Sequence, residues 1–70
     1  MEDVRANLAK NLRLARVRAR VSQEELADRA GVDRTYVSGI ERGIRNPTIA
    51  IVARLANELG TTASNLIADT

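Results

Sequence analysis

Four polar side chains, Arg34, Thr35, Tyr36 and Ser38, stand close together in the middle of the sequence, at positions that no hydrophobic core would require. An arginine can donate two hydrogen bonds to O6 and N7 of guanine, and a threonine can offer its hydroxyl to a base or its methyl group to thymine. A tyrosine can donate to a phosphate, and serine is short enough to approach a base. Residue types at this spacing are suited to contacts with the edges of DNA bases.

The helix that carries them is defined by the residues that it must bury. Helical spacing places Val37 and Ile40 on the buried face of a helix predicted over about residues 34–42, and Asp33 can cap its first turn. The outer face near the start of the helix then carries Arg34, Thr35 and Ser38, with Tyr36 at its edge. Gly39, which has no side chain, would allow this face to approach DNA closely.

A second short helix is predicted directly before this one. It begins with a capping box (SQEE, residues 22–25), in which the Ser22 hydroxyl accepts from the amide of residue 25 and the Glu25 side chain reaches back to the serine amide. Gly31 ends this helix because glycine adopts the left-handed conformation without steric cost. Two helices joined by a tight glycine-containing turn form a helix-turn-helix unit, here about residues 22–42, whose second helix can lie in the major groove. We therefore expect double-stranded DNA as the partner.

Phosphate groups should be held on both sides of this surface. Gln23 begins the first helix of the unit, whose free amides and positive dipole end favour an anion. Residues after the second helix can contact the DNA backbone on the other side, although Arg45 could instead reach into a groove. The predicted phosphate contacts are Gln23, Arg42, Arg45 and Asn46.

Helical periodicity recurs in the rest of the chain and predicts one all-α domain of five helices over residues 1–70. The first helix, over about residues 3–20, would bury Val4, Leu8, Leu12 and Ala15. A fourth helix, from a cap at Thr48 to Leu59, offers to the core Ile49, Val52, Leu55 and Ala56. Thr62 is expected to cap a short fifth helix. Three C-terminal apolar residues could all belong to the core, namely Leu59, Leu66 and Ile67. With five short helices, however, some C-terminal apolar surface should stay exposed in a monomer, and we interpret these residues as a homodimer face.

The composition excludes several classes of function. Cysteine and histidine are absent, which excludes metal sites built on them and Ser-His or Cys-His nucleophiles. No paired carboxylates indicate an acid–base site, so we expect no enzyme, no cofactor and no metal. No apolar run approaches the ~18 residues of a membrane span, and no signal peptide is visible, so we expect a cytoplasmic protein with no membrane contact. Arginine supplies ten of the eleven basic residues, which suits phosphate and guanine contacts, although a GC-rich genome would produce the same bias.

The segment SQEELADRAGVDRTYVSGIERGIRNPTI, residues 22–49, resembles the helix-turn-helix family of the phage Cro and C1 repressors, often called the XRE family. Its part DRTYVSGIERGIRNPTI is most similar to the controller proteins of restriction–modification systems, and the pattern SxIERGxRNPT also occurs in ordinary XRE regulators. The resemblance implies a five-helix phage-repressor-like fold. It also implies a homodimeric transcription regulator, of bacterial or phage origin, that binds a palindromic operator in the nucleoid.

The same resemblance assigns roles to individual residues. It implies that Gln23 holds a phosphate and that Arg45 and Asn46 serve a DNA-contacting loop. It further implies an ion pair between Arg16 of the first helix and Glu41 of the third. The groove-facing residues would be Arg34, Thr35, Tyr36 and Ser38.

Two other functions fit parts of the same pattern. An antitoxin of this family would neutralise a toxin protein and regulate its own operon, but such proteins usually carry an extra segment that is not evident here. A purely structural helical bundle would show no salt-sensitive affinity for DNA. RNA polymerase would be a further partner if the protein activates transcription. Ile44, in the loop before Pro47, is assigned no role.

Overall fold

The chain folds into five α-helices in the computed structural model, which describes residues 3–69. In chain order the helices are α1 (Val4–Arg18), α2 (Gln23–Ala30), α3 (Arg34–Glu41), α4 (Ile49–Glu58) and α5 (Ala63–Ile67). Within residues 3–69 there is no β-strand, and no helix combines the length and the apolar character needed to cross a membrane. The predicted five-helix, all-α class is confirmed.

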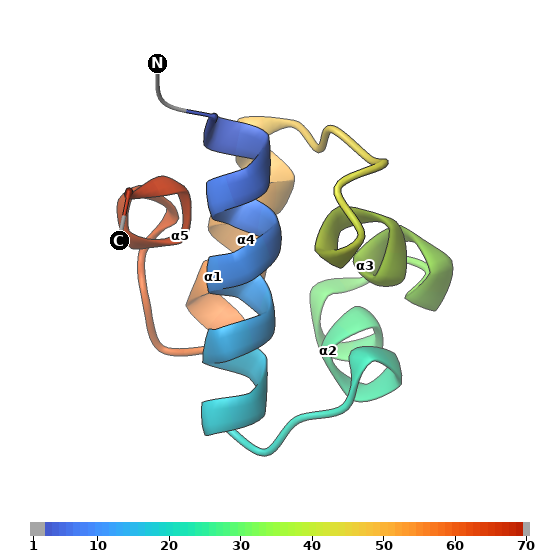
Figure 1. The fold of residues 1–70 in the computed structure, drawn as a ribbon. Coiled ribbons are helices and arrows are strands. Elements are labelled where there is room, and N and C mark those ends of the chain that lie inside the picture. Colours follow the sequence, from blue (N-terminus) through green and yellow to red (C-terminus); the bar gives the residue numbers. More distant parts are fainter. Residues whose placement is uncertain (1–2, 70) are drawn as a thin grey trace.

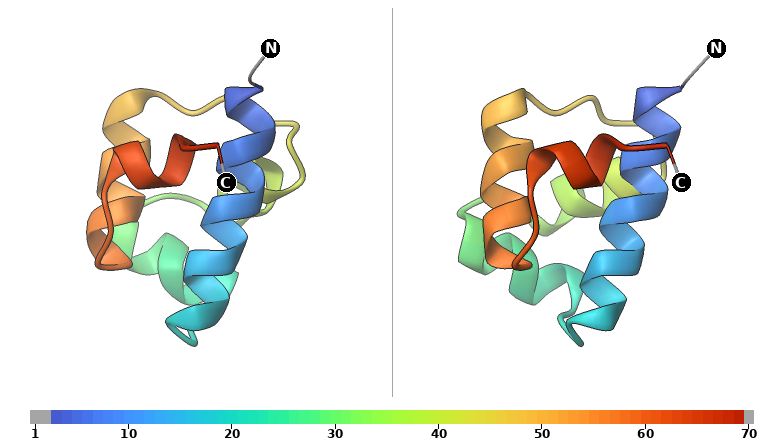
Figure 2. Two further views of the ribbon diagram at one scale, coloured as in Figure 1. Left: turned by 60° about the vertical axis from the view of Figure 1, so that its left-hand side comes forward. Right: turned by 90° about the vertical axis from the view of Figure 1, so that its left-hand side faces the viewer.

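The helices surround one core and leave α2 and α3 together at one side. Figure 1 shows α1 in front of α4, with α2 and α3 on one side of this pair and α5 on the other. Helix α3 packs on α1 and α2, and α2 also packs on α4. Helix α5 lies across α1 and α4 (Figure 2). The helix-turn-helix unit therefore lies on the opposite side of the molecule from α5.

The core consists of aliphatic side chains from all five helices. Its largest fully buried members are Leu12, Leu26, Val37, Ile40, Leu55 and Leu66. The predicted buried face of α3 is confirmed, since Val37 and Ile40 are 0% and 1% exposed. Because these two side chains point inward, the polar residues at the start of α3 are turned toward solvent.

Side-chain caps begin the helices where the sequence predicts them. Three hydroxyl side chains each accept a hydrogen bond from the backbone amide three residues later, those of Ser22, Thr48 and Thr62. Asp33 accepts from the amide of Thr35. Such bonds satisfy amides that have no partner inside the first turn of a helix. Gly31 ends α2 in the left-handed conformation, with φ 72°.

Helix α1 ends two residues earlier than predicted, at Arg18. Arg20 adopts a left-handed φ of 58°, and the amide of Val21 donates to the carbonyl of Arg16 at 3.1 Å. This reversal closes the helix and carries the chain into α2 with Val21 buried. Glycine usually marks such a helix end, and an arginine there is uncommon, so the sequence lacks the usual signal.

Three expected contacts are wrong. Val4 and Ile49 are 50% and 67% exposed, because each lies at the first position of its helix, beyond the edge of the core. The Glu25 carboxylate pairs with Arg29, four residues later, instead of reaching back to the amide of Ser22. The serine half of the capping box is therefore formed without its reciprocal half.

A buried asparagine, for which the sequence predicts no role, anchors α5 to α1. Asn11 is 8% exposed, and its Nδ2 atom donates at 3.3, 3.0 and 2.8 Å to the carbonyls of Asn65, Leu66 and Ala68. Asn7, one turn earlier, donates to the carbonyl of Ile67 at 3.3 Å. Carbonyls at the end of a helix have no partner within it, so these amide groups cap the C-terminus of α5.

Candidate nucleic-acid interface

A two-pronged ion pair joins the end of α3 to α1. Arg16 Nε lies 2.7 Å from Glu41 Oε2, and Arg16 Nη2 donates to Glu41 Oε1 at 3.0 Å. The two side chains are only 15% and 5% exposed. The hydrogen bond to Glu41 raises the pKa of Arg16. The predicted ion pair is confirmed.

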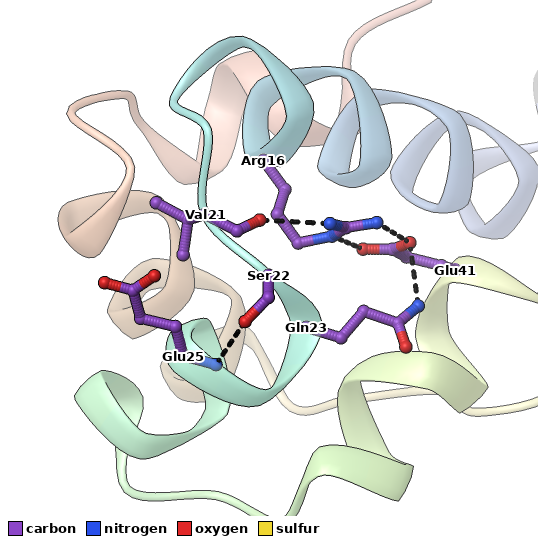
Figure 3. A network of polar contacts seen from close by, with 6 residues as sticks. All are labelled: Arg16, Val21, Ser22, Gln23, Glu25 and Glu41. Carbon is purple, nitrogen blue, oxygen red and sulfur yellow. Dashed lines mark hydrogen bonds and ion pairs between the residues drawn. The ribbon is translucent and has the colours of Figure 1, made fainter.

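The same carboxylate connects α3 to the start of α2, as Figure 3 shows. Gln23 Nε2 donates to Glu41 Oε1 at 3.1 Å, and Arg16 Nη1 donates to the carbonyl of Val21 at 3.0 Å. One network therefore holds α1, α2 and α3 relative to one another. The side-chain amide of Gln23 has two N–H groups, and this network uses one of them. Its contact with a DNA phosphate stays a prediction.

The start of α3 presents a small polar surface that is organised by Asp33. Arg34 and Thr35 are exposed, whereas Tyr36 and Ser38 are half-buried. Asp33 Oδ1 accepts from the Thr35 hydroxyl at 2.7 Å and from the Thr35 amide at 2.9 Å. Both bonds lower the pKa of the Asp33 carboxyl, and the bond from the hydroxyl has the larger effect. The sequence predicts Asp33 only as a cap, whereas in the structure its carboxylate also holds the side chain of Thr35, one of the predicted base contacts.

The loop after α3 folds back over the helix and brings Arg45 beside Tyr36. The carbonyl of Gly39 accepts from the amides of Ile44 and Arg45 at 2.9 and 3.1 Å. Arg45 Cζ lies 5.5 Å from the centroid of the Tyr36 ring, within the range of a cation–π contact. Gly39 is buried beneath this arginine. The expectation that Gly39 opens the helix to DNA is wrong, because its missing side chain makes room for Arg45.

Two of the predicted arginine contacts lie near Asp33, whereas Arg42 and Asn46 border two separate hollows. Arg34 and Arg45 both lower the pKa of Asp33 through their charge, so these three residues share one neighbourhood with Thr35. Arg42 is exposed and borders a hollow that it shares with Lys10 and Arg13 of α1. Asn46 is exposed and borders a second hollow, beside the first turns of α1 and α4.

The loop also carries Ile44, which is 63% exposed. Nothing in the structure explains an isoleucine there.

The predicted homodimer face is only partly available. Leu66 is 2% exposed, because α5 turns it into the core between α1 and α4, so this member of the face is wrong. Leu59 and Ile67 are half-buried at the edge of the core. Ile67 borders a hollow that also contains Val4 and Ile49. The contact with a second copy stays a prediction that rests on Leu59 and Ile67.

Among residues 3–69, no group of three metal-binding side chains lies close enough to hold an ion.

Helices α2 and α3 are short and are joined by a three-residue turn, and the polar start of α3 faces solvent. This arrangement defines a helix-turn-helix domain. The chain belongs to the helix-turn-helix family, whose sequence model matches residues 12–66.

Known proteins resemble this chain in sequence and in fold. A hypothetical transcription factor from Neisseria meningitidis is 47% identical over 66 residues, which are 94% of this chain and 62% of that protein. The control protein C.SmaI from Serratia marcescens is 38% identical over 65 residues, 93% of this chain and 77% of that protein. The crystal structure of the restriction–modification controller protein C.AhdI from Aeromonas hydrophila is 37% identical, has a TM-score of 0.84, and covers 89% of this chain and 94% of that one. This chain therefore spans less than two thirds of the Neisseria relative.

Proposed function

We propose that the protein is a sequence-specific DNA-binding transcription regulator, and its similarity to C.SmaI and C.AhdI favours a controller protein of a restriction–modification system. The observation that carries the proposal is the orientation of α3. Val37 and Ile40 are buried, while Arg34 and Thr35, at the start of the same helix, are exposed. In this class of domain the second helix enters the major groove and its N-terminal residues meet the base edges.

The proposed roles follow from chemistry and position. Arg34 pairs with a guanine, and Thr35 and Ser38 meet neighbouring bases, with Tyr36 at the edge of the groove. The contact between Arg45 and Tyr36 holds a guanidinium beside α3, which supports a phosphate or groove contact for Arg45. The backbone contacts that complete the surface are Gln23, Arg42 and Asn46.

A selection experiment tests the DNA-binding proposal. The wild-type protein, Arg34→Ala and Asn46→Ala are each used to enrich sites from randomised duplex DNA. We expect a distinct sequence for the wild type, and Arg34→Ala should relax the preference at one base pair and cost about 1–3 kcal/mol. Asn46→Ala should weaken binding to all sequences about evenly. No enriched sequence with the wild type, or an unchanged preference with Arg34→Ala, would overturn the assignment.

The salt dependence of binding separates a regulator from a structural bundle. Each neutralised phosphate of B-DNA contributes about −0.9 to the slope of log K against log salt, so affinity should fall steeply as salt rises. A flat salt profile would contradict the proposal. A methyltransferase gene and an endonuclease gene beside the gene of this protein would support the controller assignment, and RNA polymerase would be a second partner if the regulator activates transcription.

We propose that the active form is a homodimer, whose recognition helices lie about 34 Å apart, one turn of DNA, on a palindromic operator. Leu59 and Ile67 are the proposed contact residues. Sedimentation equilibrium of the wild type, Ile67→Lys and the control Ile44→Lys tests this, with circular dichroism to confirm folding. Ile67→Lys alone should shift the protein toward monomer. A wild type that remains monomeric on the full operator, or an Ile67→Lys variant that dimerises normally, would overturn it.

A further inference from the structure

The Thr35 hydroxyl is already committed to a partner within the protein. Its oxygen lies 2.7 Å from Asp33 Oδ1, and the same carboxylate oxygen accepts from the Thr35 amide at 2.9 Å. Asp33 is the N-cap of α3, and its backbone is extended, with φ −76° and ψ 144°. The two side chains therefore form one unit at the exposed start of α3, where the DNA contact is proposed.

The direction of the hydroxyl hydrogen follows from the charge on Asp33. Its pKa is lowered by the bonds from Thr35, so the carboxyl is ionised at neutral pH and carries no proton to donate. The single hydrogen between the two oxygens must then belong to Thr35. A hydroxyl has one hydrogen and two lone pairs, so Thr35 is left with lone pairs alone for any partner outside the protein.

This polarity restricts what the threonine can read. In the major groove, the amino groups of adenine (N6) and cytosine (N4) are donors, whereas guanine O6 and N7 and thymine O4 are acceptors. A phosphate oxygen is also an acceptor. An oxygen that can only accept is matched by an amino group and mismatched with all of these acceptors.

We propose that Asp33 makes Thr35 a specificity-determining acceptor, which selects a base that presents an amino group, adenine or cytosine, at the position facing the start of α3. This inference rests on the proposed function and makes it narrower. Asp33 acts as a positioning residue, because it works through the hydroxyl of Thr35. A threonine without this partner could rotate its hydroxyl and accept from or donate to any base.

Deletion of single amino groups from the operator tests the proposal. The operator is first selected with the wild-type protein. In successive duplexes each adenine is then replaced by purine, which lacks the 6-amino group, and each cytosine by pyrimidin-2-one, which lacks the 4-amino group. At one position in each half-site the deletion should weaken wild-type binding about 2- to 10-fold. Thr35→Val, which keeps the shape of the side chain, should bind the unmodified operator that much more weakly and be insensitive to the deletion.

Three further variants separate polarity from general damage. Ser64→Ala removes an exposed hydroxyl on α5 and should keep the wild-type sensitivity to the deletion. Asp33→Ala frees the Thr35 hydroxyl and should accept guanine or thymine at that position in a repeated selection. Asp33→Asn, which retains a capping oxygen, should keep the amino preference. Circular dichroism of every variant confirms that it is folded.

Three results would overturn the proposal. One is that Thr35→Val and the wild type respond alike to every amino deletion. This result would also be obtained if Asp33 itself accepted the hydrogen bond from the base. Another is that Asp33→Ala keeps the original preference at that position. A wild type that selects no sequence would overturn this inference together with the proposed function, whereas the first two results leave the proposed function standing.

Discussion

Gly39 of α3 lies so close beneath Arg45 that a β-carbon on this glycine would clash with Arg45 Cγ. The contact is made by the part of the arginine near its backbone, whose position is set by the two hydrogen bonds to the Gly39 carbonyl. The glycine and the loop therefore hold the guanidinium over the ring of Tyr36.

Replacement of this glycine should displace Arg45. A Gly→Ala change in a helix interior normally stabilises by about 0.5–1 kcal/mol. For Gly39→Ala we expect this gain to be lost or reversed, and DNA affinity to fall. Tyr36 is the only aromatic residue, so its emission reports the movement of Arg45 directly. In an Arg45→Ala background the cost of Gly39→Ala should shrink, and an identical cost in both backgrounds would show that the two residues are not coupled.

The ion pair between Arg16 and Glu41 should contribute more to stability than an exposed arginine does. Arg16→Ala leaves a nearly buried carboxylate with Gln23 as its remaining side-chain partner, and we expect a loss of about 1–3 kcal/mol. Arg5→Ala, on the exposed side of the same helix, should change the free energy of unfolding by no more than about 0.5 kcal/mol. Thermal unfolding measures both. Equal melting temperatures for the two variants would contradict the role of the pair.

Asn11 should be the polar side chain on which the docking of α5 depends. Asn11→Leu removes the side-chain donor to three carbonyls and should destabilise the protein by about 1–3 kcal/mol, because the bond to Leu66 is buried and the bonds to Asn65 and Ala68 are partly buried. Asn57→Ala, at an exposed position of α4, is the matched control and should have little effect. Urea unfolding compares the two. A Leu variant as stable as the wild type would mean that the Asn11 hydrogen bonds add nothing to the docking of α5.

The pH dependence of the Asp33 carboxyl follows from its bonds to Thr35. Its pKa lies below the ordinary value of 3.8, so its contribution to stability is fully present above that value and is lost as pH falls through the lower folded-state pKa. An NMR titration of the carboxyl carbon should show this lowered midpoint. In Thr35→Val, which lacks the hydroxyl, the midpoint should rise toward 3.8. A midpoint that is the same in both proteins would show that the hydroxyl does not bond to the carboxylate.

Much of the fold could be predicted because its signals are local. Ser22, Asp33, Thr48 and Thr62 cap helices through amides two or three residues away, so their role depends on the neighbouring sequence alone. The buried face of α3 could also be predicted, because two apolar residues three positions apart leave little choice of orientation in a helix.

The features that could not be predicted depend on residues distant in the sequence or on the end of an element. Leu66 is an apolar residue of the short helix α5, and the sequence of this helix would be the same whether Leu66 contacted the core or a second copy of the chain. The bonds from Asn11 cross more than fifty positions of the chain. The left-handed Arg20 has no glycine to mark it, and the packing of Arg45 on Gly39 requires the path of the loop.

We propose above all that the start of α3 meets DNA. An NMR titration of the ¹⁵N-labelled protein with its selected operator duplex, and with a scrambled duplex of the same composition, tests it most directly. We expect the amides of residues 34–38 to shift most, accompanied by Gln23 and residues 42–46. The shifts of residues 34–38 should also differ between the two duplexes. Shifts confined to α1 and α5, or identical shifts with both duplexes, would contradict it.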